Sequence, residues 1–375
     1  ATLEQLVDSN SGITESLLGA NTPTERTTYI NWARGKNTDG SNRLAVGDVL
    51  HNEPRLIAYT TDENLVRASN DSLPRPGDKD YDANATPKYD PAIGPSPEQL
   101  YMFFGSNEGY IHAINPVNGT EKFAFLPKEL LSNPGAYFRD AKGSNNKRYG
   151  MDGFINVWTE YGPISANKTR SITQAYLYAG MRRGGSNYYS LDVTNIDTPS
   201  LKWVIKGPQQ TAQGNGTVVN AATGFTPGYE KLGLTFSAAK LAQIKINGTK
   251  KKVLIFSGGY DLDQDFVGTN LPKTDDIGNS LFIADAITGE LLWSASNSGA
   301  VLKIDEMNHS IPASPTIIDV NRDGLSDIIY IADIGGQVFR FDINNSNGGS
   351  SDLATGGRIA QLGGTTAANN RRFFT

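Results

Sequence analysis

The sequence predicts a mainly β protein assembled from repeated four-stranded antiparallel sheets. Its 375 residues include 40 glycines and 18 prolines, a composition typical of short strands joined by tight turns. Four apolar runs end at or just before a glycine, and these glycines (105, 180, 258 and 335) are 75, 78 and 77 residues apart. Such regular spacing indicates a repeat in which each unit packs on its neighbours, not one large core. We therefore predict a β-propeller. A β-sandwich is the alternative, but it does not require four copies of one hairpin pattern.

The first predicted element is a helix over residues 23–34. Residues 22–25 read Thr-Pro-Thr-Glu, which is a capping box with proline in the first turn, and Gly35 stands where a helix would end. We expect a helical segment, 1–42, that packs on a propeller domain, 43–375. Three residues are expected to make this contact: Tyr29, Ile30 and Trp32.

The predicted propeller consists of four units with the same order of strands. Their approximate limits are 43–127, 148–205, 229–293 and 309–375. The first strands are expected at 54–59, 154–158, 234–241 and 315–319. Each is followed by an apolar strand, a strand of alternating character and, in the first three units, a turn and an apolar piece ending in an aromatic residue.

The last unit and two long connections break this pattern. The last unit is expected to lack its fourth strand, because the sequence ends at Thr375. A four-bladed ring is uncommon, so we expect the chain to end inside a larger propeller. Residues 62–96 and 209–228 are predicted to be long exposed insertions.

Composition excludes several classes of function. The net charge of −5, with only short basic runs, argues against nucleic-acid binding. No run of 18 apolar residues is present, so no membrane span is expected. The absence of cysteine excludes disulfides, thiolate metal sites and cysteine nucleophiles. A three-histidine zinc site would need all three histidines to converge: His51, His112 and His309.

One loop, residues 319–327, carries the residue types of a cation site. It reads Asp-Val-Asn-Arg-Asp-Gly-Leu-Ser-Asp, with oxygen-bearing side chains at positions 1, 3, 5 and 9 and glycine at position 6. Ca²⁺ takes roughly six to eight oxygen ligands, and alternate spacing on a curled loop directs such oxygens inward. We therefore predict one Ca²⁺ ion and no other cofactor. The expected ligands are Asp319, Asn321, Asp323, Leu325 (through its carbonyl) and Asp327.

The flanks of this loop distinguish its subtype. An EF-hand has a bidentate glutamate at position 12, where this sequence has Tyr330, and β-branched strands replace the two helices. Magnesium is disfavoured because it usually keeps several waters. The alternative is an Asx-rich turn whose acids only bind backbone amides.

Other motifs have a structural interpretation. The segment from Asp285 through Thr288-Gly289 to Trp293 resembles the tryptophan motif of quinoprotein-type propellers, which locks blades together. We expect that architectural role here, although a quinoprotein or hydrolase enzyme remains an alternative class. A second acidic triplet, Asp261, Asp263 and Asp265, is predicted to be at most a weak cation site. No nucleophile elbow or phosphate loop is present.

With these motifs in view, the chain resembles the C-terminal domain of the PilY/PilC family, the type IV pilus-associated biogenesis factors and adhesins. The resemblance covers nearly the whole chain. It rests on residues 31–35, 46–54, 105–113, 180–185, 278–280, 288–290, the loop 319–327 with 333–336, and 371–374.

The resemblance implies a modified seven-bladed propeller at the pilus, cell surface, outer membrane or periplasm of a Gram-negative bacterium. It implies that calcium in the loop 319–327 governs pilus extension and retraction, twitching motility and adhesion, without enzymatic activity. The implied partners are pilins and minor pilins, with host surface ligands bound through other regions of the family's proteins. An integrin-like calcium propeller is a further alternative, disfavoured because only one unit has the full loop.

Overall fold

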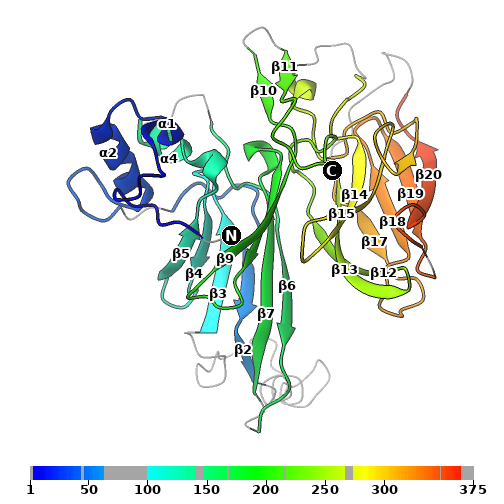
Figure 1. The fold of residues 1–375 in the computed structure, drawn as a ribbon, viewed down its shortest axis with the longest axis horizontal. Coiled ribbons are helices and arrows are strands. Elements are labelled where there is room, and N and C mark those ends of the chain that lie inside the picture. The colour runs from blue at the N-terminus through cyan, green and yellow to red at the C-terminus, as the bar shows by residue number, and fades with distance from the viewer. Residues whose placement is uncertain are drawn as a thin grey trace, which may run out of the picture.

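The computed structural model describes residues 3–43, 46–62, 99–139, 147–166, 169–213, 217–266, 273–346 and 348–364. Within these ranges the chain forms four antiparallel sheets that follow one another along the sequence, here called blades 1 to 4 (Figure 1). The predicted mainly β fold of four-stranded blades is confirmed.

The blades have the following strands. Blade 1 contains β1 (Arg55–Ala58), β3 (Leu100–Gly105), β4 (Ile111–Ile114) and β5 (Glu121–Phe125). Blade 2 contains β6 (Ile155–Tyr161), β7 (Thr169–Gly180), β8 (Asn187–Asp192) and β9 (Ser200–Lys206), and β2 (Thr60–Asp62) also pairs with β7. Blade 3 contains β12 (Lys240–Ile246), β13 (Thr249–Ser257), β14 (Ser280–Asp285) and β15 (Leu291–Ser296), with the short parallel β16 (Leu302–Lys303) beside it. Blade 4 contains β17 (Thr316–Ile318), β18 (Ile328–Ala332), β19 (Gln337–Ile343) and β20 (Ala354–Gln361).

Each pair of consecutive blades encloses its own apolar core. Phe103 of blade 1 and Leu177 of blade 2 lie in one buried cluster. On the opposite face of blade 2, Tyr178 packs in a second cluster with Phe256 of blade 3. A third cluster joins blades 3 and 4. Alternating side chains of one strand therefore serve two cores, as face-to-face packing of propeller blades requires.

The regularly spaced glycines lie where successive units come closest. A Cβ atom at Gly105 would overlap the carbonyl oxygen of Met151, which leads into blade 2. A Cβ atom at Gly180 would lie 3.0 Å from the carbonyl oxygen of Thr235, which leads into blade 3. The repeat of about 77 residues in the sequence thus marks the points where the next unit crosses its predecessor.

Tryptophans in the fourth strands of blades 2 and 3 join neighbouring blades. The ring of Trp203 lies against Gly289 of blade 3, and its Nε1 donates to the Ala286 carbonyl oxygen at 3.3 Å. Trp293 of blade 3 is fully buried, with its ring 5.8 Å from that of Phe341 in blade 4. These contacts are the architectural role predicted for the tryptophan motif.

Three helices gather beside blade 1: α1 (Glu15–Leu18), α2 (Pro23–Ala33) and α4 (Asn133–Arg139) (Figure 1). The Thr22 half of the predicted capping box is present, since the Thr22 hydroxyl accepts from the Glu25 amide at 3.1 Å, whereas the Glu25 carboxylate accepts from the Asn21 amide at 2.7 Å. The rings of Tyr29 and Trp32 pack on Phe138 of α4 at 5.7 and 5.5 Å. The apolar face of α2 therefore contacts another helix and not a sheet directly, because the connection after β5 supplies α4, which the sequence pattern did not predict. Short 3₁₀ turns occur at Lys128–Leu130, Arg182–Gly184 and Leu262–Asp265.

Two strand predictions were wrong. Blade 4 has a fourth strand, β20, which was missed because Gly356 and Gly357 interrupt its apolar alternation; pairing with β19 defines it. The first strand of blade 3 begins at Lys240, later than expected. The preceding Leu234 instead forms an isolated bridge with Tyr260.

The structure describes one of the two predicted insertions and not the other. Residues 63–96 lie outside the described residues, as does the family-like segment 371–374. The 209–228 connection contains a hairpin of β10 (Gln210–Ala212) and β11 (Val218–Asn220).

Candidate functional sites

The predicted cation loop, residues 319–327, connects β17 to β18 at one end of blade 4. Its last residues are held by the surrounding sheets. The Ser326 amide donates to the Gln243 carbonyl oxygen of β12 at 2.8 Å, and the Asp327 carbonyl oxygen accepts from the Ile343 amide at 2.7 Å. The loop is therefore anchored to both blade 3 and the end of β19.

The loop curls around the carboxylate of Asp319. Two residues with positive φ, Arg322 at 64° and Gly324 at 83°, produce the curl. As a result, Asp319 Oδ1 accepts from the Arg322 amide at 2.6 Å and Oδ2 accepts from the Gly324 amide at 2.9 Å. Backbone groups that would otherwise point to solvent are satisfied inside the loop.

The other predicted ligands also turn toward the backbone. Asn321 Oδ1 accepts from the Asp323 amide at 2.9 Å, and Asp323 Oδ1 accepts from the Leu325 amide at 2.8 Å. Asp327 Oδ2 accepts from the Val320 amide at 2.8 Å, which closes the loop. The structure thus places all five predicted ligand residues in one closed turn.

The donor set fits a calcium ion in its chemistry. Three carboxylates and one amide oxygen lie within nine residues, and the buried side chain of Leu325, 2% exposed, fixes the backbone that carries the fifth donor. Each carboxylate oxygen that accepts from an amide keeps a second lone pair for a cation. In the part of the chain that is described, no three acidic or imidazole side chains gather closely enough to hold a metal ion. Binding would therefore require the carboxylates to turn toward a common centre.

The second acidic triplet does not form a site. Asp261 accepts from the Gln210 side chain at 2.9 Å, Asp263 pairs with Lys273, and Asp265 pairs with Arg183 at 2.6 Å. Burial raises the pKa of Asp261, and the three carboxylates serve different partners. The three carboxylates therefore do not converge, because tertiary contacts divide residues that are close in sequence.

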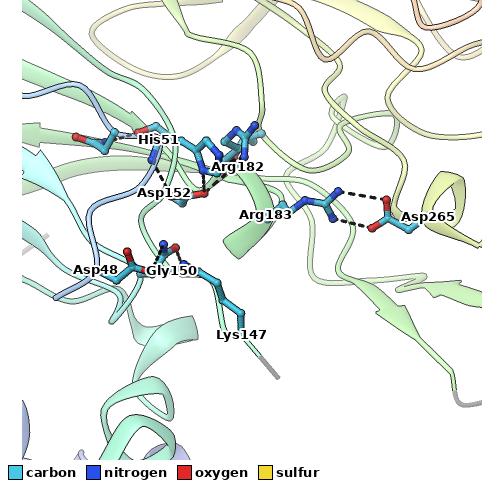
Figure 2. A network of polar contacts seen from close by, with 12 residues as sticks. Asp48, His51, Lys147, Gly150, Asp152, Arg182, Arg183 and Asp265 are labelled. Atoms are coloured by element: carbon cyan, nitrogen blue, oxygen red, sulfur yellow. Dashed lines mark hydrogen bonds and ion pairs between the residues drawn. The ribbon is translucent and has the colours of Figure 1, made fainter. Parts of the chain in front are cut away.

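A polar cluster that the sequence did not reveal joins blades 1 and 2 (Figure 2). The buried carboxylate of Asp152, 1% exposed, accepts from the His51 amide at 3.3 Å and lies 2.7 Å from His51 Nδ1. Arg182 Nη1 lies 3.7 Å from the same carboxylate. Burial lowers the pKa of Arg182, and the attraction of Asp152 opposes that shift. No spacing in the sequence indicates this cluster, since its members are far apart along the chain.

Arg183, the next residue, belongs to a different contact. Its guanidinium makes two hydrogen bonds with Asp265, at 2.6 and 3.2 Å (Figure 2). Neighbouring arginines therefore face separate carboxylates.

A sequence profile of the PilY1 beta-propeller domain matches residues 96–361, which is more than half of the chain. The chain belongs to the PilY1 beta-propeller family. This assignment confirms the family resemblance and the propeller fold.

Two curated relatives are both type IV pilus biogenesis factors. The chain is 23% identical over 337 residues to PilY1 of Pseudomonas aeruginosa, covering 87% of this chain and 24% of that protein. It is 23% identical over 313 residues to the PilY1 homolog of Xylella fastidiosa, covering 80% of this chain and 18% of that protein. The chain thus spans about a quarter or less of these relatives.

Among solved structures, the chain is similar to the C-terminal domain of Pseudomonas aeruginosa PilY1. The identity is 20%, the TM-score is 0.45, and the match covers 72% of this chain and 48% of that chain. None of the helices in the described ranges has the length and apolar character needed to cross a membrane.

Proposed function

We propose that this chain is the calcium-binding propeller region of a type IV pilus biogenesis factor and that it acts by binding, not by catalysis. The observation that carries the proposal is the combination of the family match over residues 96–361 with a five-donor acidic loop at a blade corner. The relatives' role in pilus biogenesis supports the first half, and the chemistry of the loop supports the second.

The electrostatics of the loop favour a dication. Asp319, Asp323 and Asp327 place three negative charges within nine residues, and like charges at such separations repel one another. A bound Ca²⁺ ion would remove this repulsion and hold the loop to the frame provided by Gln243 and Ile343. Occupancy would then make the corner of blade 4 rigid.

Calcium occupancy regulates pilus extension and retraction in this proposal. The rigid corner presents one surface to pilins and minor pilins, and the empty loop presents another, so calcium shifts the balance between the two states. Twitching motility and surface adhesion follow that balance. The chain would operate at the pilus, outer membrane or periplasm of a Gram-negative bacterium.

Calorimetric titration of metal-free protein with CaCl₂ tests the metal site. We expect one site in the wild type and at least about a tenfold loss of affinity in Asp323→Ala, since an anionic ligand is removed. Asp305→Ala is the matched control, because Asp305 is exposed and, within the described residues, pairs with the exposed Lys303. Equal calcium binding in wild type and Asp323→Ala would show that the loop is not the site.

Restoring the same variants to a strain that lacks the parent gene tests the regulatory part. We expect Asp323→Ala to alter surface piliation and twitching, while Asp305→Ala behaves as wild type. Suppose that a variant whose loop no longer binds calcium shows normal piliation and twitching. That result would contradict the regulatory role, but it would not contradict the proposal that the wild-type loop binds calcium.

A further inference from the structure

A cavity of about 660 Å³ lies where the segments that lead into the four blades meet. Its volume is in the range typical of small-molecule sites. The wall is mostly apolar, with a few polar side chains that converge on the space. The residues used below are His51, Glu53, Phe154, Arg182, Phe236 and Ala313.

The segments that lead into the first strand of every blade meet at this cavity. His51 precedes β1, Phe154 precedes β6, Phe236 precedes β12 and Ala313 precedes β17. The cavity therefore lies where the four blades converge. Space at such a junction is bounded by backbone that the blades hold in place, so it is formed before any ligand arrives.

Arg182 is the cationic group of the cavity. Its backbone has a φ of 51°, a conformation that non-glycine residues rarely adopt, and its amide donates to the Thr235 carbonyl oxygen at 3.2 Å. The guanidinium carbon lies 4.4 Å from the centre of the Phe236 ring. Within the described residues, neither Nε nor Nη2 of Arg182 donates a hydrogen bond to the protein. These two groups form the planar fork that matches a carboxylate.

His51 is oriented by Asp152 behind it. His51 Nδ1 lies between Asp152 Oδ2 at 2.7 Å and Arg182 Nη1 at 3.0 Å. An ionised carboxylate can only accept, so the Nδ1 proton lies toward Asp152, and Arg182 contributes charge instead of a hydrogen bond. His51 Nε2 is left without a hydrogen bond to the described protein groups, and the ring remains partly exposed.

The one acidic side chain of the lining is already neutralised. Glu53 pairs with Arg55 at 3.1 Å, and both side chains are exposed. Its repulsion of an anion is screened by solvent and by this partner. Asp152 carries charge as well, but it is buried behind His51 and Arg182.

We propose that this cavity binds a small organic carboxylate, with Arg182 receiving the carboxylate and Phe154 and Phe236 covering its apolar part. The site is separate from the calcium loop, which lies at the opposite end of β17 and β18. The proposal does not depend on the calcium site.

Calorimetry of the complete chain with naphthoate tests the proposal. Naphthamide, which has the same shape without the charge, and naphthylmethylamine, its cationic counterpart, are titrated in parallel. We expect naphthoate to bind at least about tenfold more tightly than either, since a charge-assisted pair with arginine is lost in both. Failure of naphthoate to bind at millimolar concentration, or tighter binding of the amine, overturns the proposal.

Two kinds of variant locate the binding. Arg182→Gln is expected to weaken naphthoate binding about tenfold or more, and the matched control Arg183→Gln to change it less than about twofold, since Arg183 faces Asp265. Ala313→Phe places a bulky ring in the cavity while keeping its charged groups, and should weaken naphthoate binding at least about tenfold. Circular dichroism and thermal unfolding establish that each variant is folded. Should Arg182→Gln not fold, Ala313→Phe decides alone, and unchanged binding in Ala313→Phe places the ligand elsewhere and refutes the inference.

Discussion

The acidic loop, residues 319–327, and the cluster of His51, Asp152 and Arg182 bring charged groups together in opposite ways. In the loop, residues 319–327, neighbours in sequence are neighbours in space, and the side-chain oxygens accept from backbone amides of the same loop. In the cluster, His51 and Asp152 are 101 residues apart, and His51 and Arg182 are 131 apart. Asp152 is 1% exposed, whereas Asp323 is exposed.

This difference determines how much each region contributes to the stability of the fold. An exposed loop can lose a carboxylate with little effect on folding, because water solvates the groups left behind. A buried carboxylate cannot be lost so easily, because its partners stay buried without it. The loop is therefore free to respond to a ligand, whereas the cluster is part of what joins blades 1 and 2.

The largest expected effect tests this contrast directly. Asp152→Ala should lower the free energy of unfolding by about 3 kcal/mol, because it leaves His51 without its acceptor and the partly buried Arg182 without the nearby negative charge. Without calcium, Asp323→Ala should leave unfolding nearly unchanged. Urea denaturation of both variants in chelator measures the difference. Equal losses of stability in the two variants would remove the distinction between the regions.

A second variant tests the frame of the loop. The side chain of Asn345 donates to the Ser326 carbonyl oxygen at 2.8 Å and to Asp327 Oδ1 at 3.3 Å, and accepts from the Lys245 amide at 2.9 Å. Because these bonds are partly buried, Asn345→Ala should cost about 2 kcal/mol, measured by urea denaturation without calcium.

The adjacent Ser346 is the control for this variant. It is exposed, and among the described residues its side chain bonds to that of Asn344, so Ser346→Ala should have no measurable effect. If Asn345→Ala also leaves the free energy of unfolding unchanged, the loop is not anchored through this side chain.

The smallest expected effect concerns the curl of the loop. Gly324 has a φ of 83°, and nothing lies within 4 Å of a Cβ atom built there. Gly324→Ala should therefore cost about 1 kcal/mol through backbone conformation alone. Gly357→Ala is the matched control, since it has equal space in β20 without a positive φ. Thermal unfolding of Gly324→Ala and Gly357→Ala measures the free energy that the positive φ costs. Identical unfolding midpoints in the two variants would contradict the explanation by backbone conformation.

Much of the fold was predictable because it depends on local pattern. The glycine spacing, the hairpin turns and the alternation of apolar residues identified four repeated sheets, and residues 22–25 identified the start of α2. The strand β20 was missed because glycines hide its pattern, and its place is decided by hydrogen bonding to β19. Helix α4, on which Tyr29 and Trp32 pack, was missed as well.

The sequence by itself determined the repeat, the family resemblance and the nine-residue acidic loop, since each depends on residues at fixed short spacings. Tertiary structure alone decided that Asp261, Asp263 and Asp265 have separate partners, and that His51, Asp152 and Arg182 form one polar cluster. The physical reason is that a short loop fixes the separation of its own side chains. Groups more than 100 residues apart meet only where the packing of whole blades brings them together.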